Sequence, residues 1–420
     1  MRKRAILSLA IIAVLMFMVA TDAAVASSDI LGALSRGDWD YVLKTGRQEK
    51  TVNFAMWSGD RVTNSWVDGY LANLVKEKYG ITLRRVPMDA REFVNKIVAE
   101  KQAKVGDTGG TIDLLWVNGE NFKTLKEVGG LFGPYAYDLP TFKAYLKPNQ
   151  PDVMYDFGYP IEGYESPYCK AQFTFFYNAK YVKEPFKNLS ELAAWVKANP
   201  GRFTYPMPPD FTGTTFMKTM FYATTGGYEQ WQGDFKADLY GKKVGQTWDF
   251  LKGIEPYLWR KGATYPSSKA MMDELYAQGE IWWTMSYGPL DAKSMIADGR
   301  FPESTRPVIF EDGSLSNSNF VAIPYNAPRK DAALLVADLL CSPEVQLHKF
   351  DPENWGALMF YDVSKVSPEL KRKVAEVEGK MGPSVPGSAV MSKYAVPEPH
   401  VDYTMALEKD WVDNVLRKRK

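Results

Sequence analysis

The chain has 420 residues, with 51 lysines and arginines against 50 aspartates and glutamates, so its charge is nearly balanced. A balanced chain gives no electrostatic basis for binding nucleic acid or an anionic membrane surface, and neither partner is predicted. The length exceeds the ~250–300 residues at which a single hydrophobic core stops growing, so two domains are expected. The basic end Arg417-Lys418-Arg419-Lys420 is interpreted as a solvated helix terminus.

The first residues have the three parts of a secretory signal. Arg2-Lys3-Arg4 is followed by an uncharged apolar core over 5–20 and by the small residues Ala24-Val25-Ala26. We therefore predict a signal peptide over 1–26, cleavage between Ala26 and Ser27, and a mature protein free in the periplasm. The alternative, a membrane anchor, needs about 20 apolar residues, and this core is shorter. No later segment is long and apolar enough to span a bilayer, so no integral membrane protein is predicted.

A regular alternation of strands and helices comes next. Strands are predicted over 51–56, 81–86 and 112–117, each followed by a helix, over 64–79, 89–104 and 119–128. Three such units in a row indicate a parallel sheet covered on both faces, and such sheets bind ligands outside the carboxyl ends of their strands. That rule selects Trp57-Ser58-Gly59-Asp60 and Asn118-Gly119-Glu120-Asn121. Ordinary capping of the next helix is the equal alternative for Asp60 and Asn118.

The middle of the chain is predicted to cross between two lobes. Glu165-Ser166-Pro167-Tyr168 leads into a strand over 172–177, and Asn317-Ser318-Asn319 precedes a returning strand over 320–324. We place lobe 1 at 27–168 plus 318–350, and lobe 2 at 169–317 plus 351–420.

Two turns of the second lobe are further candidates for ligand contact. A proline-rich loop ends in Asp210-Phe211-Thr212-Gly213-Thr214, where Asp210 or Thr212 can cap the helix running to Thr224. A rigid loop before a helix presents free N–H groups that suit an anionic or polar ligand group, although a plain capped helix explains the same pattern. Ser286-Tyr287-Gly288-Pro289 follows a buried strand over 280–285, and a simple tight turn is its alternative interpretation.

The residues that carry metal or hydrolytic chemistry are sparse. The only histidines are His348 and His400, in late segments and without clustered ligands, so no metal and no cofactor are predicted. Ser286 lacks the glycine that a nucleophile elbow has two residues earlier, and no enzyme activity is predicted. A carboxylate-pair hydrolase stays as a minor alternative, since Asp and Glu are too common to argue from. Cys169 and Cys341 leave a disulfide and two buried thiols equally open.

The mature chain resembles the extracellular solute-binding proteins of bacterial ABC importers. Within them it is most similar to a branch related to the thiamine-, iron(III)- and polyamine-binding group. The likeness rests on Trp57–Asp60, Leu114–Phe122, Glu165-Ser166-Pro167, the loop from Tyr205 to Thr214, and Leu258-Trp259-Arg260. It implies a two-lobed α/β fold of the periplasmic-binding-protein type II, each lobe a doubly wound sheet, joined by crossover strands. It also implies a ligand in the interlobe cleft, hinge closure around it, and permease subunits in the inner membrane as partners of a monomer.

The predicted ligand residues come from these strand ends and turns. They are Trp57, Ser58, Gly59, Asp60, Trp116, Asn118, Gly119, Glu120, Asn121, Glu165, Ser166, Tyr168, Phe211, Thr212, Gly213, Thr214, Ser286, Tyr287 and Asn319. Acidic and aromatic residues in this set favour a cationic ligand, thiamine-like or a polyamine, through charge pairing and cation–π contact. A sugar is the alternative, because sugars also stack on aromatic rings.

Overall fold

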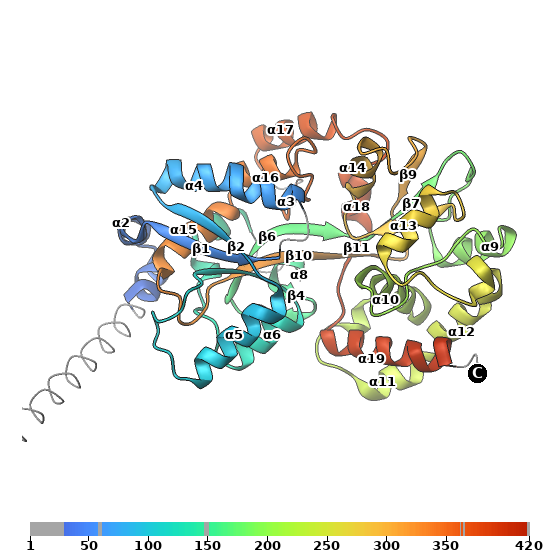
Figure 1. The fold of residues 1–420 in the computed structure, drawn as a ribbon, viewed down its shortest axis with the longest axis horizontal. Coiled ribbons are helices and arrows are strands. Elements are labelled where there is room, and N and C mark those ends of the chain that lie inside the picture. Colours follow the sequence, from blue (N-terminus) through green and yellow to red (C-terminus); the bar gives the residue numbers. More distant parts are fainter. Residues whose placement is uncertain (1–28, 58–60, 147–150, 362, 364–365, 418–420) are drawn as a thin grey trace, which may run out of the picture.

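The computed structural model describes residues 29–57, 61–146, 151–361, 363 and 366–417. The predicted signal peptide with its cleavage pair Ala26 and Ser27, and the candidate residues Ser58, Gly59 and Asp60, lie outside the described residues. Figure 1 shows two lobes side by side, with strands running between them. The two-lobed α/β fold predicted from the sequence is confirmed.

The first lobe is built on the predicted parallel strands. They are β1 (Thr51–Met56), β2 (Thr82–Pro87) and β3 (Leu114–Val117), with Thr51 opposite Thr82 and Phe54 opposite Leu114. A helix follows each strand: the continuous run α3 (Arg61–Trp66), η1 (Val67–Leu71) and α4 (Ala72–Tyr79), then α5 (Ala90–Gln102), then α6 (Glu120–Glu127). In Figure 1, α4 lies on one face of the sheet and α5 and α6 lie on the other. This lobe is therefore wound on both sides, as its βα units predict.

Local sequence explains where these helices begin and end. Asp89 and Glu92 form a reciprocal capping box at the start of α5. Gly80 ends α4 in the left-handed conformation, at φ 71°. Two further helices, α2 (Trp39–Glu49) and α15 (Lys330–Leu340), pack against each other in this lobe. Every residue of α15 is buried, since its apolar side chains all face protein.

Two long antiparallel strands connect the lobes. β6 (Glu165–Gln172) pairs with β10 (Ser314–Ala322), from Ala322 opposite Glu165 to Ser316 opposite Gln172. β10 also pairs with β3, and β11 (Ala395–Pro397) runs parallel to the start of β10. The sheet order is β11-β10-β3-β1-β2, with β6 on β10. Both crossings begin earlier in the chain than predicted. In β10 the segment from Ser314 to Asn319 is mostly polar, so it gives no hydropathy signal although most of it is buried.

The second lobe has a smaller sheet of three antiparallel strands. β7 (Thr174–Asn178) lies between β8 (Trp283–Ser286) and β9 (Thr305–Val308). The sheet therefore differs from the doubly wound, parallel arrangement expected in each lobe. The reason is directional: β7 continues the crossing strand β6 into the lobe, and β8 and β9 both run against it. The helices of this lobe are α9 (Leu189–Ala198), α10 (Phe211–Thr225), α11 (Ala237–Lys243), α12 (Gly245–Ile254), α13 (Lys269–Ala277), α14 (Asp291–Ala297) and α19 (Val401–Trp411).

The C-terminal part of the chain divides between the two cores. After α16 (Pro343–Phe350), the buried side chains of α17 (Pro368–Glu378) and α18 (Ser388–Tyr394) belong to the first core. The buried side chains of α19 belong to the second. We predicted that 351–420 belongs wholly to the second lobe. In the structure α17 lies on α16, so the first part of that segment packs against the first lobe.

Short elements complete the fold. They are η2 (Ala136–Asp138), α7 (Pro140–Tyr145), α8 (Pro151–Met154), β4 (Tyr155–Asp156), β5 (Tyr159–Pro160), η3 (Glu229–Trp231), η4 (Glu255–Tyr257), η5 (Trp259–Gly262) and η7 (Val412–Leu416). The strands β4 and β5 pair as a hairpin. Within the described ranges, no helix is long and apolar enough to cross a membrane.

Candidate functional site

The carboxyl ends of β1 and β3 carry the first predicted ligand residues. Trp57 follows β1 and leaves 49% of its surface exposed. Trp116, within β3, donates its indole N–H to Asn118 Oδ1 at 3.0 Å. Asn118 in turn donates to the Ser318 carbonyl at 3.1 Å, so it joins the end of β3 to the crossing strand β10. Its side chain makes no capping bond to α6, so the capping alternative does not apply to Asn118, and ligand contact stays a prediction.

The N-terminus of α6, a predicted ligand position, already holds a carboxylate of the protein. Asp156, at the end of β4, accepts the Gly119 N–H at 2.5 Å and an Asn118 side-chain N–H at 3.4 Å. Asp156 is fully buried, and burial raises its pKa to about 7, although both hydrogen bonds lower it. Glu120 is exposed and Asn121 half-buried in the same helix turn. Asp156 was not among the predicted residues, because its only signal in the sequence is an Asp before a Phe-Gly turn.

The start of α10 is likewise capped from within. Asp210 accepts the N–H groups of Thr212 at 3.0 Å and Gly213 at 3.1 Å, which is the capped-helix alternative. Thr212 and Gly213 are buried, and a Cβ on Gly213 would lie 2.1 Å from the Pro206 carbonyl oxygen. Thr214 donates to Glu408 Oε1 at 2.7 Å. Only Phe211 of this group presents a large surface, with 53% exposed.

A buried ion pair lies beneath the turn that follows β8. Lys218 of α10 is 2.5 Å from Glu398, with 2% and 0% of their side chains exposed. Tyr287 donates its hydroxyl to the same carboxylate at 2.7 Å. Ser286 instead donates to Asp291, beside α14. Lys218 and Glu398 were also not predicted. A single lysine in an apolar helix does not indicate which distant carboxylate in the sequence will pair with it.

Three of the predicted residues belong to the hinge strand β6 and are buried there. Glu165 is fully buried, and neither of its carboxyl oxygens has a hydrogen-bond partner among the described residues. Burial raises the pKa of this carboxyl well above its usual range, and the nearby Asp156 carboxyl raises it further. Ser166 is also buried, and the Tyr168 ring lies 4.7 Å from the Lys349 ammonium. All three side chains are buried within the crossing strand β6.

The cysteines lie in the same hinge region. Cys169 and Cys341 are free buried thiols, and Asn319 of β10 donates to Cys169 Sγ at 3.1 Å. Of the two possibilities left open by the sequence, the structure has the free thiols. Asn319 therefore packs within the hinge.

Three aromatic rings lie at the contact between the lobes. Phe157, at the tip of the β4–β5 hairpin, lies 6.4 Å from Phe211 in an edge-to-face geometry. Phe211 lies 5.3 Å from Tyr287. Through Asp156, this contact is continuous with Asn118 and Gly119. The structure thus brings four of the predicted residues, from both lobes, to one place.

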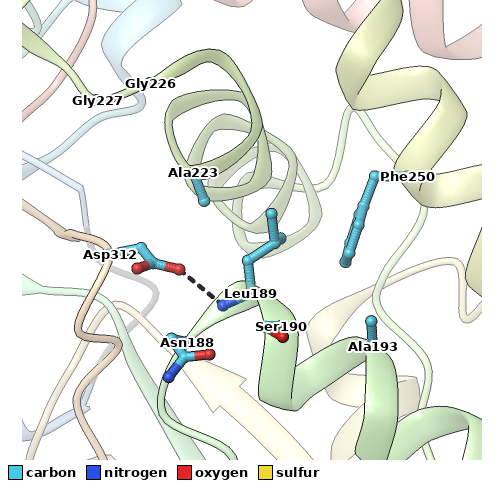
Figure 2. A pocket seen from close by; sticks show the side chains of 9 residues that line it. All are labelled: Asn188, Leu189, Ser190, Ala193, Ala223, Gly226, Gly227, Phe250 and Asp312. Carbon is cyan, nitrogen blue, oxygen red and sulfur yellow. Dashed lines mark hydrogen bonds between the residues drawn. The ribbon is translucent and has the colours of Figure 1, made fainter.

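Two cavities lie apart from this contact. One of about 620 Å³ is in the second lobe, between the start of α9, the end of α10 and Asp312 (Figure 2). Another, of about 390 Å³, lies between α3 and α16 and includes Trp66 and His348. Neither is lined by a predicted ligand residue. In the part of the chain that the structure describes, no group of three or more His, Cys, Asp or Glu side chains is placed to hold a metal.

Two α/β lobes joined by crossing strands, with strand ends and helix starts of both lobes meeting in between, define a two-lobed binding protein. The chain belongs to the bacterial extracellular solute-binding proteins, whose family model matches residues 70–372. The family predicted from the sequence is confirmed.

The chain is also similar to individual proteins, in sequence or in structure. Protein YnjB of Escherichia coli (strain K12) is 35% identical over 381 residues, covering 90% of this chain and 94% of its own. The spermidine/putrescine ABC transporter substrate-binding protein PotD of Streptococcus pneumoniae has a TM-score of 0.61 at 16% identity, covering 88% of this chain and 100% of its own. An ABC transporter protein of Clostridium perfringens has a TM-score of 0.60 at 15% identity, covering 87% and 99%. The two structures share the fold.

Proposed function

We propose that this protein is the substrate-binding component of an ABC importer. It binds one small solute between its lobes, in the periplasm, and delivers it to permease subunits in the inner membrane. The observation that carries the proposal is the architecture: two lobes joined by the crossing strands β6 and β10, in a chain whose family is the bacterial extracellular solute-binding proteins. Two exposed rings are candidate contacts for the solute: Trp57 at the end of β1, with 49% of its surface exposed, and Phe211 at the start of α10, with 53%.

The solute is proposed to be a small organic cation, thiamine-like or a polyamine. Trp57 and Phe211 offer ring faces for cation–π contact, and Glu120 is an exposed carboxylate at the first turn of α6. Two further carboxyls do not support a cation site in the same way, because Glu165 is fully buried and Asp156 is hydrogen-bonded to the start of α6. A sugar is the second candidate, and the same exposed rings favour it through stacking.

Isothermal titration of the mature protein with spermidine, thiamine and a set of monosaccharides distinguishes these solutes. We expect one class to bind, and Trp57→Ala to weaken that binding by about tenfold, since one cation–π contact contributes ~0.5–2 kcal/mol. Met405→Ala is a matched control, because Met405 is 60% exposed on α19 and belongs to none of the contacts described above. Unchanged affinity in both Trp57→Ala and Phe211→Ala would place the ligand site elsewhere.

A further inference from the structure

The tip of the β4–β5 hairpin has an unusual backbone. Phe157 has φ 44° and Gly158 has φ 73°, so both turn residues lie in the left-handed region. A bulky residue with positive φ is uncommon and costs energy, and it persists only where surrounding contacts hold it. The hairpin flanks, Val153 and Ile161, are buried in the cores of the first lobe. The hairpin is therefore a fixed part of that lobe.

Hydrogen bonds hold the base of the tip in place. Asp156 accepts N–H groups from Gly119 and Asn118, at the start of α6. The Phe157 backbone N–H donates to Asn317 of β10 at 3.4 Å. The tip is thus tied to a helix of the first lobe and to a crossing strand.

The far side of the tip touches the second lobe. A Cβ on Gly158 would lie 2.5 Å from the His400 nitrogen, 2.6 Å from its Cα and 2.8 Å from the Pro399 carbonyl carbon. All three nearest atoms belong to the backbone just before α19. Only glycine permits this approach, because real Cβ atoms do not come so close to backbone atoms.

Side chains surround the same contact. The Phe157 ring lies 5.2 Å from the Lys218 ammonium and packs edge-on against Phe211, both of α10. Tyr159 lies 6.0 Å from the His400 ring, and Lys123 of α6 is 3.5 Å from Asp402 of α19. Each contact joins a first-lobe group directly to α10 or to the start of α19. Docking of the tip against these helices therefore requires only protein groups.

We infer that the hairpin tip, residues 156–158, is a latch that holds the two lobes together in the absence of solute. The latch separates when the lobes open, and Gly158 sets the balance between the docked and open states. The inference rests on the proposed function only in that solute capture requires the lobes to move. It assigns that movement to one glycine and one phenylalanine, neither of which belongs to the predicted ligand set.

Gly158→Ala tests the latch because the three atoms nearest to the added methyl group all belong to the opposite lobe. The docked state acquires a clash with the His400 backbone, and the open state does not. We expect the docked population to fall by about tenfold or more, since overpacking a close contact is costly. Gly80→Ala is the matched control: Gly80 has φ 71°, and its Cβ would meet nothing within 4 Å, so it shares the backbone strain without the clash.

The measurement is small-angle X-ray scattering of the mature protein after unfolding, dialysis and refolding have removed any bound solute, with native mass spectrometry to check that none remains. We expect wild type and Gly80→Ala to fit the docked structure, and Gly158→Ala to have a larger radius of gyration. Phe157→Gly relieves the strained φ, removes the ring contacts, and is also expected to open the lobes while circular dichroism stays unchanged. An open wild type, a compact Gly158→Ala, or equal opening of Gly80→Ala would overturn the latch. Because no solute is present, these results are independent of the titrations that test the proposed function.

Discussion

Two buried lysines, one at the lobe contact and one near the crossing strands, have different neighbours. Lys218, at the lobe contact, has a carboxylate 2.5 Å away in Glu398. Lys349, at the hinge, has no hydrogen-bond partner among the described residues. Its ammonium lies against the rings of Tyr168, Trp355 and Trp66, at 4.7, 5.7 and 5.9 Å.

The two lysines differ in how far their neighbours offset the free-energy cost of burying an ammonium group. Aromatic faces attract an ammonium but do not replace its water, so burial lowers the pKa of Lys349 to about 8. At the lobe contact, a full counter-charge and the Tyr287 hydroxyl surround the pair. The buried charge beside the lobe contact is thus paired, whereas the buried charge of Lys349 is disfavoured by its loss of water.

Removing one member of the pair is expected to have the largest effect. Lys218→Met leaves Glu398 buried without its counter-charge, which destabilises a protein by about 3–5 kcal/mol. Urea unfolding of the mature protein measures the loss. The double variant Lys218→Met/Glu398→Leu removes both charges and is expected to recover most of the stability. A double variant as unstable as the single one would show that packing, and not the unpaired carboxylate, causes the loss.

The same substitution at the hinge is expected to act in the opposite direction. Lys349→Met removes a disfavoured ammonium and keeps an unbranched chain among the rings, so it should raise the free energy of unfolding at pH 7 by about 1–3 kcal/mol. Matched urea melts of the two Lys→Met variants give the comparison directly. If both variants lose the same stability, the two lysines do not differ as described.

The pH dependence sharpens that contrast. The folded-state pKa of Lys349 is about 8 and its unfolded-state value is about 10.5, so the unfolded chain binds more protons between these two pH values. Wild-type stability should therefore rise from pH 8 to 10.5 relative to Lys349→Met, by about 1.4 kcal/mol per pH unit at most. The gap between wild type and variant is full below pH 8 and shrinks above it. A gap that stays constant to pH 10 would contradict the lowered pKa.

The smallest effect on stability is expected at the exposed ring of the lobe contact. Phe211→Ala should leave the unfolding free energy nearly unchanged, because 53% of the side chain is already exposed. It should weaken solute binding by about tenfold, as measured by titration.

Trp116→Ala is expected to weaken binding as well, through the loss of the indole hydrogen bond that orients Asn118. Wild-type affinity in Trp116→Ala alone would limit the site to the exposed rings.

The first lobe was predictable in detail because its signals are local. Apolar strands and amphipathic helices alternate, and β1 begins and ends at the predicted residues. β10 was placed too late, since the segment from Ser314 to Asn319 is mostly polar, and it is mostly buried where β6 and β11 pair with β10. Hydropathy along the chain does not record such burial.

The candidate site was predicted less completely than the fold. The strand-end rule selected Gly119 and the cap pattern selected Thr212 and Gly213, and the structure fills these helix starts with Asp156 and Asp210. Whether a helix terminus is open depends on a side chain that can come from anywhere in the chain. Asp156 is 37 residues from Gly119, and Glu398 is 180 from Lys218, so no local pattern connects them.

Native mass spectrometry of the mature protein, purified gently from its own export compartment, tests the central claim of solute capture between the lobes most directly. The account predicts one small-molecule adduct per chain that is released on denaturation and is absent from the double variant Trp57→Ala/Phe211→Ala. An adduct of the same mass and occupancy in that folded double variant would contradict a ligand site between the facing lobes.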